Sequence, residues 1–278
     1  MVPQPIRRAA VAGSWYPGTE AALRAEVDRY LESAGTPPQG EVLGVMAPHA
    51  GLIYSGPVAA HAYRALEGRR FDVAVLVGPS HYVAFEGVAV YPRGAFETPL
   101  GPVLIEETIA ADLLRQSSVV RDDPVTHARE HSLEMQLPFL RRVLPDTPIV
   151  PLVMGHQHPE TIEGLADALG TVLAGRRALL IASSDLSHYY DASTAARLDG
   201  RVLEFVKRFD PEGLLAALQA FPEHACGGGP AVAVMAAARA LGARQGVVLR
   251  YADSGDVSGD KSAVVGYLAA VFGNFQGS

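Results

Sequence analysis

Cysteine and lysine are the residues that this sequence has least of. Its 278 residues include one cysteine, Cys226, so no intramolecular disulfide can form. A zinc site built from several thiolates is excluded for the same reason. Of the 23 basic residues only Lys207 and Lys261 are lysines, which leaves two candidates for a Schiff-base or phosphate-binding lysine. The chemistry of this chain must therefore depend mainly on other side chains.

Long apolar runs are missing as well. No stretch reaches the roughly 18 uncharged apolar residues of a membrane-spanning helix. The chain opens with MVPQPIRRAAVAGSWYPG, which lacks the apolar core of about 7–15 residues found in a secretory signal. The net charge of −7 and the pI of about 5.7 argue against a nucleic-acid-binding protein. With 49% hydrophobic and 19% charged residues, we expect a folded, soluble, cytoplasmic protein with no nucleic-acid or membrane partner.

Several common catalytic motifs are also absent. The sequence contains no GxxxxGKS/T phosphate loop, no GxGxxG turn, no GxSxG nucleophile elbow and no HExxH helix. These absences count against nucleotide-binding enzymes, α/β-hydrolases and zincins.

Short apolar segments alternate with amphipathic segments along the chain. The apolar segments are hydrophobic almost throughout, as strands covered on both faces should be. They predict strands at Val42–Ala47, Asp72–Gly78, Gly87–Tyr91, Ile149–Met154, Ala178–Ser183, Val247–Tyr251 and Ala263–Phe272. The amphipathic segments predict helices at 19–34, Pro57–Leu66, Glu107–Arg115, Ser132–Val143, Pro159–Leu173, Thr194–Arg208, Pro211–Leu218 and Pro230–Leu241. This pattern predicts an α/β fold: a single three-layer α/β/α domain, residues 1–278, with a central, mainly parallel (mixed) sheet.

Three of the predicted strands run directly into a loop that carries a histidine. His49 follows the first strand, His81 follows the second, and Asp185 and His188 follow the strand at Ala178–Ser183. In open α/β sheets, ligands bind in the crevice beyond the carboxyl ends of the strands. A single histidine of this kind is more often structural, but we expect three of them at strand ends to share a site.

Cys226 fits the same site. It is followed by three glycines and lies just ahead of the helix predicted to start near Pro230. The partial positive charge at a helix N-terminus favours the thiolate over the thiol. Two imidazoles and one thiolate make a site for iron(II), copper or zinc that leaves open positions for substrate or water. The alternative interpretation is an inert buried cysteine.

His131 and Glu134 form a further candidate pair. If their segment is helical, the two side chains share a face at i, i+3. Such a pair could relay a proton or anchor a metal ligand. An ordinary exposed helix pair explains the spacing equally well.

Six motifs occur in an order that identifies a family. They are Ala12-Gly13-Ser14-Trp15-Tyr16, Ala47-Pro48-His49-Ala50-Gly51, Gly78-Pro79-Ser80-His81, Glu130-His131-Ser132-Leu133-Glu134, Ser183-Ser184-Asp185-Leu186-Ser187-His188 and Cys226-Gly227. Together they resemble the MEMO family, whose prokaryotic members are called AmmeMemoRadiSam system protein B. The similarity spans nearly the whole chain.

The resemblance implies a site as well as a fold. The fold of the family is similar to that of class III extradiol dioxygenases, which are non-haem iron enzymes. Carried over by motif, the metal ligands are His49, His81 and Cys226, and Asp185 and His188 line the same pocket. In the dioxygenases a glutamate is the third ligand, and here Cys226 takes its place. Iron(II) is the metal that the resemblance favours, with copper and zinc as alternatives.

Three functions are consistent with these residues. The leading hypothesis is metal-dependent redox chemistry on a small-molecule or peptide substrate, with His188 as acid/base. Asp185 would orient that ring or the metal-bound water, and His131 and Glu134 are further catalytic candidates. The second is a non-catalytic binding protein that uses the pocket for a partner or peptide, and the third is a zinc hydrolase. The prokaryotic family name implies association with an AMMECR-type protein and a radical SAM enzyme.

Overall fold

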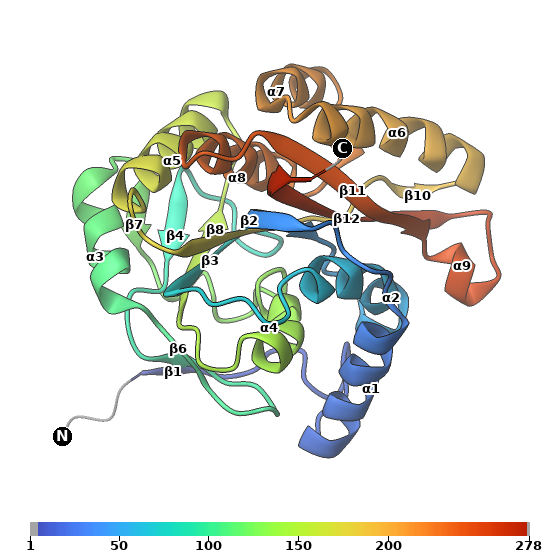
Figure 1. Ribbon diagram of the computed structural model, residues 1–278, viewed down its shortest axis with the longest axis horizontal. Coiled ribbons are helices and arrows are strands. Elements are labelled where there is room, and N and C mark those ends of the chain that lie inside the picture. The colour runs from blue at the N-terminus through green and yellow to red at the C-terminus, as the bar shows by residue number, and fades with distance from the viewer. Residues whose placement is uncertain (1–4, 277–278) are drawn as a thin grey trace.

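A large β-sheet organises the computed structural model, which describes residues 5–276 (Figure 1). The terminal residues of the predicted domain, 1–4 and 277–278, lie outside the described residues. Within the described range the sheet has nine strands in the order β10-β12-β2-β9-β3-β8-β4-β7, and β11 also pairs with β12. Their bounds are β2 (Gly40–Ala47), β3 (Val73–Pro79), β4 (Val88–Val90), β7 (Val120–Asp122), β8 (Ile149–Met154), β9 (Ala178–Ser183), β10 (His188–Tyr190), β11 (Gln245–Asp253) and β12 (Val264–Phe275).

The centre of the sheet is parallel, and an antiparallel pair borders it on each side. Strands β2, β9, β3 and β8 run in the same direction, with Val45 opposite Ile181 and Val75 opposite Leu180. Strand β12 is antiparallel to β2, and β4 is antiparallel to β8. A separate small sheet joins β1 (Ile6–Arg7), β5 (Ala95–Phe96) and β6 (Val103–Leu104).

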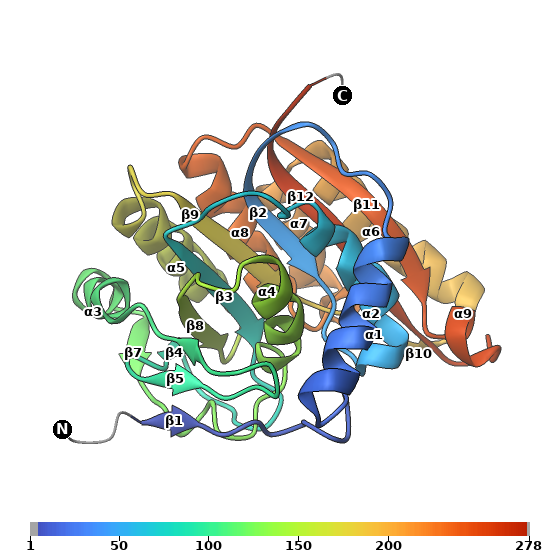
Figure 2. The same ribbon diagram turned by 60° about the horizontal axis from the view of Figure 1, so that its bottom comes forward.

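Helices cover both faces of the large sheet (Figures 1 and 2). Helices α1, α2 and α4 lie on one face, and α5, α6, α7 and α8 lie on the other. The helices are α1 (Glu20–Ser33), α2 (Leu52–Arg64), α3 (Glu107–Gln116), α4 (Leu137–Val143), α5 (Pro159–Val172), α6 (Ala192–Arg208), α7 (Pro211–Ala220), α8 (Gly228–Ala240) and α9 (Gly255–Ser258), with 3-10 helices η1 (Glu134–Gln136) and η2 (Pro222–His224). The predicted three-layer α/β/α fold with a mainly parallel, mixed sheet is thus confirmed.

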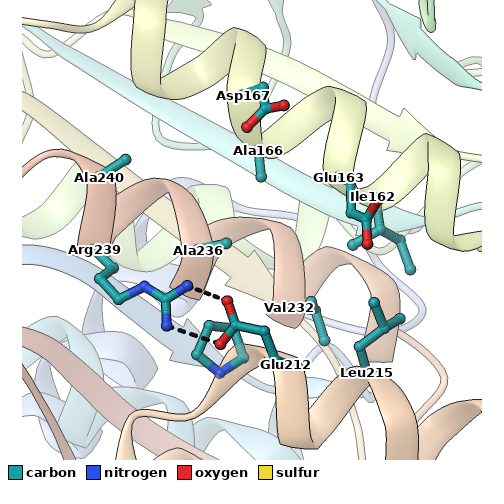
Figure 3. A pocket seen from close by; sticks show the side chains of 11 residues that line it. Ile162, Glu163, Ala166, Asp167, Glu212, Leu215, Val232, Ala236, Arg239 and Ala240 are labelled. Carbon is teal, nitrogen blue, oxygen red and sulfur yellow. Dashed lines mark hydrogen bonds and ion pairs between the residues drawn. The ribbon is translucent and has the colours of Figure 1, made fainter.

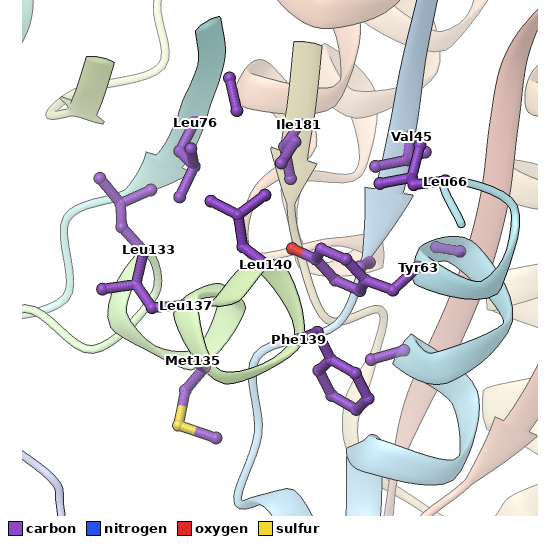
Figure 4. Close-up of a cluster of buried hydrophobic side chains, with 14 of the residues drawn as sticks. Val45, Tyr63, Leu66, Leu76, Leu133, Met135, Leu137, Phe139, Leu140 and Ile181 are labelled. Carbon is purple, nitrogen blue, oxygen red and sulfur yellow. The ribbon is translucent and has the colours of Figure 1, made fainter. Parts of the chain in front are cut away.

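The two cores explain why the strands are apolar on both faces. Figure 4 shows the core under α2 and α4, where Tyr63 stacks on Phe139 with ring centroids 5.2 Å apart and Ile181 of β9 points toward Leu140. A second core of buried side chains fills the space between the other face and α5 and α8. Alternate residues of each central strand therefore enter opposite cores, which is why these strands are apolar at almost every position.

Two predicted helices differ from the structure. The helix predicted to begin at Pro57 begins at Leu52, where the backbone N–H of Leu52 donates to the carbonyl of Trp15 at 2.8 Å. The helix predicted at Ser132–Val143 is divided into η1 and α4. Both regions contact the N-terminal segment, Leu52 through Trp15 and Glu134 through Arg7, and local periodicity does not report such contacts.

The parallel strands deliver their loops to one edge of the sheet. Because β2, β9 and β3 are neighbours and run the same way, the residues that follow Ala47, Pro79 and Ser183 emerge side by side. Between residues 5 and 276, none of the helices combines the length and the apolar character needed to cross a bilayer.

Candidate metal centre

His49, His81 and Cys226 meet beyond the carboxyl ends of the central strands. One donor atom from each, a ring nitrogen or the sulfur, lies within 4.8 Å of the other two. His49 Nε2 is 3.3 Å from Cys226 Sγ, and the rings of His49 and His81 are 5.2 Å apart at their centroids. With metal–ligand bonds of about 2.0–2.3 Å, donors at this spacing can share one ion.

A close approach of two backbones places Cys226. Its N–H donates to the carbonyl of Asp185 at 3.3 Å, which fixes the start of α8 against the end of β9. A Cβ added at Gly227 would lie 2.3 Å from the carbonyl oxygen of Ser183, so no other residue fits there without a shift. The glycine after the cysteine is therefore what lets the thiol reach the histidines.

His49 is neutral and buried. Its backbone N–H donates to Asp185 Oδ1 at 2.7 Å, and its ring Nδ1 lies 2.9 Å from Ser183 Oγ. Burial, followed by the charge of His81, lowers the pKa of His49 to about 3. The ring therefore carries no proton to be displaced when a cation binds at neutral pH.

Glu130 holds His81 and is a site residue that we did not predict. The carboxylate of Glu130 accepts from the His81 backbone N–H at 2.6 Å and contacts His81 Nδ1 at 2.8 Å. Burial raises the pKa of Glu130, but hydrogen bonds from His81 outweigh it and bring that pKa to about 2. A carboxylate behind a ligating imidazole orients the ring and strengthens it as a donor. Its position directly before His131 in the fourth motif was the available signal.

His131 joins the cluster through its ring. It stacks on His81 at 4.4 Å between centroids and lies 4.3 Å from the ring of Trp15. Burial, followed by the charges of His49 and His81, lowers the pKa of His131 to about 4. His131 therefore forms part of the wall of the site as an uncharged ring.

Glu134 does not share a helix face with His131, which corrects our expectation for this pair. His131 precedes η1, and Glu134 points to the N-terminal segment instead. Its carboxylate pairs with Arg7 and accepts from the backbone N–H groups of Ala10 at 2.8 Å and Val11 at 3.0 Å. Tyr16 donates its hydroxyl to the same carboxylate at 2.6 Å. The structure thus gives Glu134 the task of fixing the segment that carries Trp15.

Asp185 lies on the loop that follows β9, and His188 is the first residue of β10. Asp185 is 3% exposed and accepts backbone hydrogen bonds from His49 and Ala50, while burial raises its pKa. His188 Nδ1 lies 2.8 Å from the carbonyl oxygen of Leu186. A carbonyl can only accept, so Nδ1 carries the hydrogen and Nε2 of a neutral His188 is free to take a proton. A positive charge at His188 would lower the pKa values of both His49 and Asp185, which places His188 within electrostatic range of the cluster.

The thiol of Cys226 behaves differently from our expectation. Burial raises its pKa, and the nearby Asp185 carboxylate raises it further. The favourable effect expected from the N-terminus of α8 is smaller than this desolvation cost. In the metal-free protein the group is therefore a thiol at neutral pH, and a cation must displace its proton to bind.

Two cavities lie on the α5–α7–α8 side of the molecule. One of about 450 Å³ is lined by these three helices, and the Glu212–Arg239 ion pair joins α7 to α8 in its wall (Figure 3). Another of about 390 Å³ is lined by Cys226 and Gly229 at the start of α8. Ile162 and Leu215 line both cavities, so the two lie next to each other and the loop of Cys226 borders the second.

The buried neutral histidines predict a steep loss of stability in acid. Burial lowers the pKa values of His49, His127 and His131 to between about 3 and 4, against about 6.5 in an unfolded chain. Below pH 6.5 these histidines therefore bind protons in the unfolded chain but stay neutral in the folded chain. We expect the free energy of unfolding to fall by up to about 1.4 kcal/mol per pH unit for each histidine.

Urea unfolding of the metal-free protein at pH 7, 6 and 5 measures this slope. His127→Gln is the matched variant, because His127 Nε2 contacts the carbonyl of Ala89 at 3.1 Å and lies away from the metal ligands. In this variant the free energy of unfolding should depend on pH less steeply, by the uptake of one proton on unfolding. An unchanged pH dependence would show that His127 is not a buried neutral histidine with a lowered pKa.

Comparison with known proteins identifies the family that this chain resembles. Residues 7–271 match the family profile described as Memo-like protein. A MEMO1 family protein of Methanothermobacter thermautotrophicus is 39% identical over 272 residues, covering 94% of this chain and 98% of that protein. MEMO1 family proteins of Methanopyrus kandleri and Methanosarcina mazei are 39% and 40% identical, each covering 96% of this chain and 98% of the relative.

A solved structure supports the fold alone. The crystal structure of an uncharacterized Escherichia coli K12 protein superposes with a TM-score of 0.56 at 16% sequence identity. The match covers 84% of this chain and all of the bacterial chain. It adds no information on the chemistry of the site.

Proposed function

This chain belongs to the family of Memo-like proteins, and on that premise we propose that it binds a redox-active metal, iron(II), on His49, His81 and Cys226 and uses it to transform a small-molecule or peptide substrate. The observation that carries the proposal is the convergence of these three donor atoms within 4.8 Å. They come from three loops that are far apart in the sequence.

The donor set fits such a metal. Both imidazoles have one ring nitrogen engaged behind the site, His49 with Ser183 and His81 with Glu130, which leaves the other nitrogen of each for a cation. Nitrogen and sulfur donors suit iron, copper and zinc, and three protein ligands leave positions open. When bound, iron or copper supplies one-electron chemistry that side chains cannot perform.

The residues around the three donors accept a proton, position His49 and form an apolar wall. His188 takes a proton from a hydroxyl group of the substrate at its free Nε2, and its Nδ1–H bond to Leu186 holds the ring in that orientation. Asp185 accepts one hydrogen bond from the backbone N–H of His49 and one from that of Ala50, which fixes the loop that carries His49. The uncharged ring of His131 and the indole of Trp15 provide an apolar wall on one side.

Anaerobic purification with elemental analysis and spectroscopy of the bound metal tests this proposal. Iron or copper near one equivalent, lost in His49→Ala and retained in His188→Ala, is the expected result, because His188 contacts Leu186 rather than the three donors. Oxygen uptake that depends on added substrate should be lost in both variants. Zinc at one equivalent without oxygen uptake would instead favour hydrolysis, and a protein that binds none of these metals would favour a binding role.

A further inference from the structure

A buried chain of hydrogen bonds runs from the core to His49. The hydroxyl of Tyr63 in α2 lies 2.9 Å from Gln136 Oε1 in η1, and Gln136 Nε2 lies 2.7 Å from Ser183 Oγ at the end of β9. Ser183 Oγ in turn lies 2.9 Å from His49 Nδ1. All four side chains are 2% exposed or less. Each of these side chains finds its partners within the protein, so the position of each hydrogen follows from counting the donors and acceptors.

Two backbone carbonyls determine where the hydrogens lie. Ser183 Oγ is 2.6 Å from the carbonyl oxygen of Ser132, and two oxygens this close require a hydrogen between them. The carbonyl has none, so the single hydroxyl hydrogen of Ser183 points to Ser132. Gln136 Nε2 also lies 3.0 Å from the carbonyl oxygen of Pro48, so this end of the amide is the donor.

The two remaining positions on Ser183 are therefore acceptors. One lone pair receives the N–H of Gln136, and the other faces His49 Nδ1. Because Ser183 has no second hydrogen to give, His49 must supply the hydrogen of that bond. Its Nε2, which faces Cys226 Sγ at 3.3 Å, is then the nitrogen with the free lone pair.

We propose that Ser183 and Gln136 are positioning residues that lock His49 in the Nδ1–H tautomer and aim its Nε2 lone pair at Cys226. Nothing in this assignment requires a bound ion, because it follows from the contacts of the metal-free protein. Its consequence for metal affinity rests on the proposed function, since only a ligating His49 gains from a fixed tautomer.

The two histidines of the cluster are therefore held by different means. His81 is backed by the buried carboxylate of Glu130, whereas His49 is backed by a neutral hydroxyl whose capacity is fully used. Ser183 lies on β9, between β2 and β3, so the order of strands in the sheet places this hydroxyl behind His49.

Nitrogen NMR of the 15N-histidine-labelled, metal-free protein tests the tautomer directly. We expect the His49 ring, assigned by comparison with the His49→Ala spectrum, to show a protonated Nδ1 and an unprotonated Nε2. In Ser183→Ala the hydroxyl acceptor is gone and only the Ser183 backbone contact remains, so the population of the Nε2–H tautomer should rise. A protonated Nε2 in the wild-type protein would overturn the proposal, and this measurement stands even if the variant does not fold.

Titration with Zn²⁺ against a chromophoric chelator provides the second readout. Ser183→Ala should weaken zinc binding by about 10–100-fold, the usual effect of removing a group behind a metal ligand. Ser55→Ala is the matched control, because Ser55 is equally buried and donates its hydroxyl to the carbonyl of Ala50 without contacting a histidine. It should bind zinc as the wild type does.

The outcomes separate the two proposals. A Ser183→Ala protein that keeps both the wild-type tautomer and the wild-type zinc affinity would overturn the role of Ser183. A wild-type protein that binds no metal while showing the Nδ1–H tautomer would overturn the metal centre and leave the hydrogen-bond assignment intact.

Discussion

Replacing Cys226 by serine should weaken copper(I) binding on the order of 1000-fold and iron(II) binding on the order of 10-fold. Copper(I) is a soft ion that prefers thiolate, and a hydroxyl is a hard, poor ligand for it. The sulfur lies 3.3 Å from His49 Nε2, so no other side chain needs to move for it to join the site. Anaerobic titration of the wild type and Cys226→Ser with each ion measures both ratios.

The pH dependence of the same titration provides an internal check. Burial and then Asp185 raise the pKa of Cys226, while His49 is already neutral. At pH 8 and above, where ordinary imidazoles have also lost their protons, binding should release one proton, from the thiol. Affinity should then fall tenfold for each unit that the pH drops toward 8, and this dependence should vanish in Cys226→Ser. If Cys226→Ser binds copper(I) as tightly as the wild type does, and likewise iron(II), then the thiolate is not a ligand.

Replacing Glu134 by alanine should cost about 3–5 kcal/mol of folding free energy. The change leaves the guanidinium of Arg7 buried without its ion-pair partner. It also removes the acceptor for the N–H groups of Ala10 and Val11 and for the hydroxyl of Tyr16. Urea unfolding of the wild type and the variant gives the difference.

The neighbouring ion pair is a control within the same segment. Arg8, 77% exposed, pairs with Glu97, and Glu97→Ala should cost less than about 1 kcal/mol. Trp15 is the only tryptophan and lies on His131, so its fluorescence reports whether the segment has detached. A Glu134→Ala protein as stable as Glu97→Ala, with unchanged emission, would show that this ion pair does not hold the segment.

The central strands could be read from the sequence because their environment is simple. Strands β8 and β9 match the predicted Ile149–Met154 and Ala178–Ser183, and both are buried at every position. Burial on both faces leaves a continuous apolar run that needs no partner to be recognised. The two-residue strands β1, β5 and β6 were not predicted, because two residues contain no periodicity.

The site was predictable where it depended on strand ends and not where it depended on long-range contacts. His49 and His81 follow directly from the strands before them. Glu134 was assigned to the wrong surroundings because its partner Arg7 is 127 residues away in the sequence. The pKa of Cys226 was expected to fall because the sequence indicates a helix N-terminus but not the burial that outweighs it.

The strand order has a consequence for when the proposed ion could be bound during biogenesis. His49 and Cys226 are separated by 177 residues, and β9 is inserted between the strands that carry His49 and His81. The three donors therefore come together only after the middle of the sheet is built and the chain beyond residue 226 has been made. Zinc fingers fold around their metal, whereas the three donors proposed here meet only once the sheet is built. On the proposed function, ion capture would therefore be a late maturation step, performed by a folded protein.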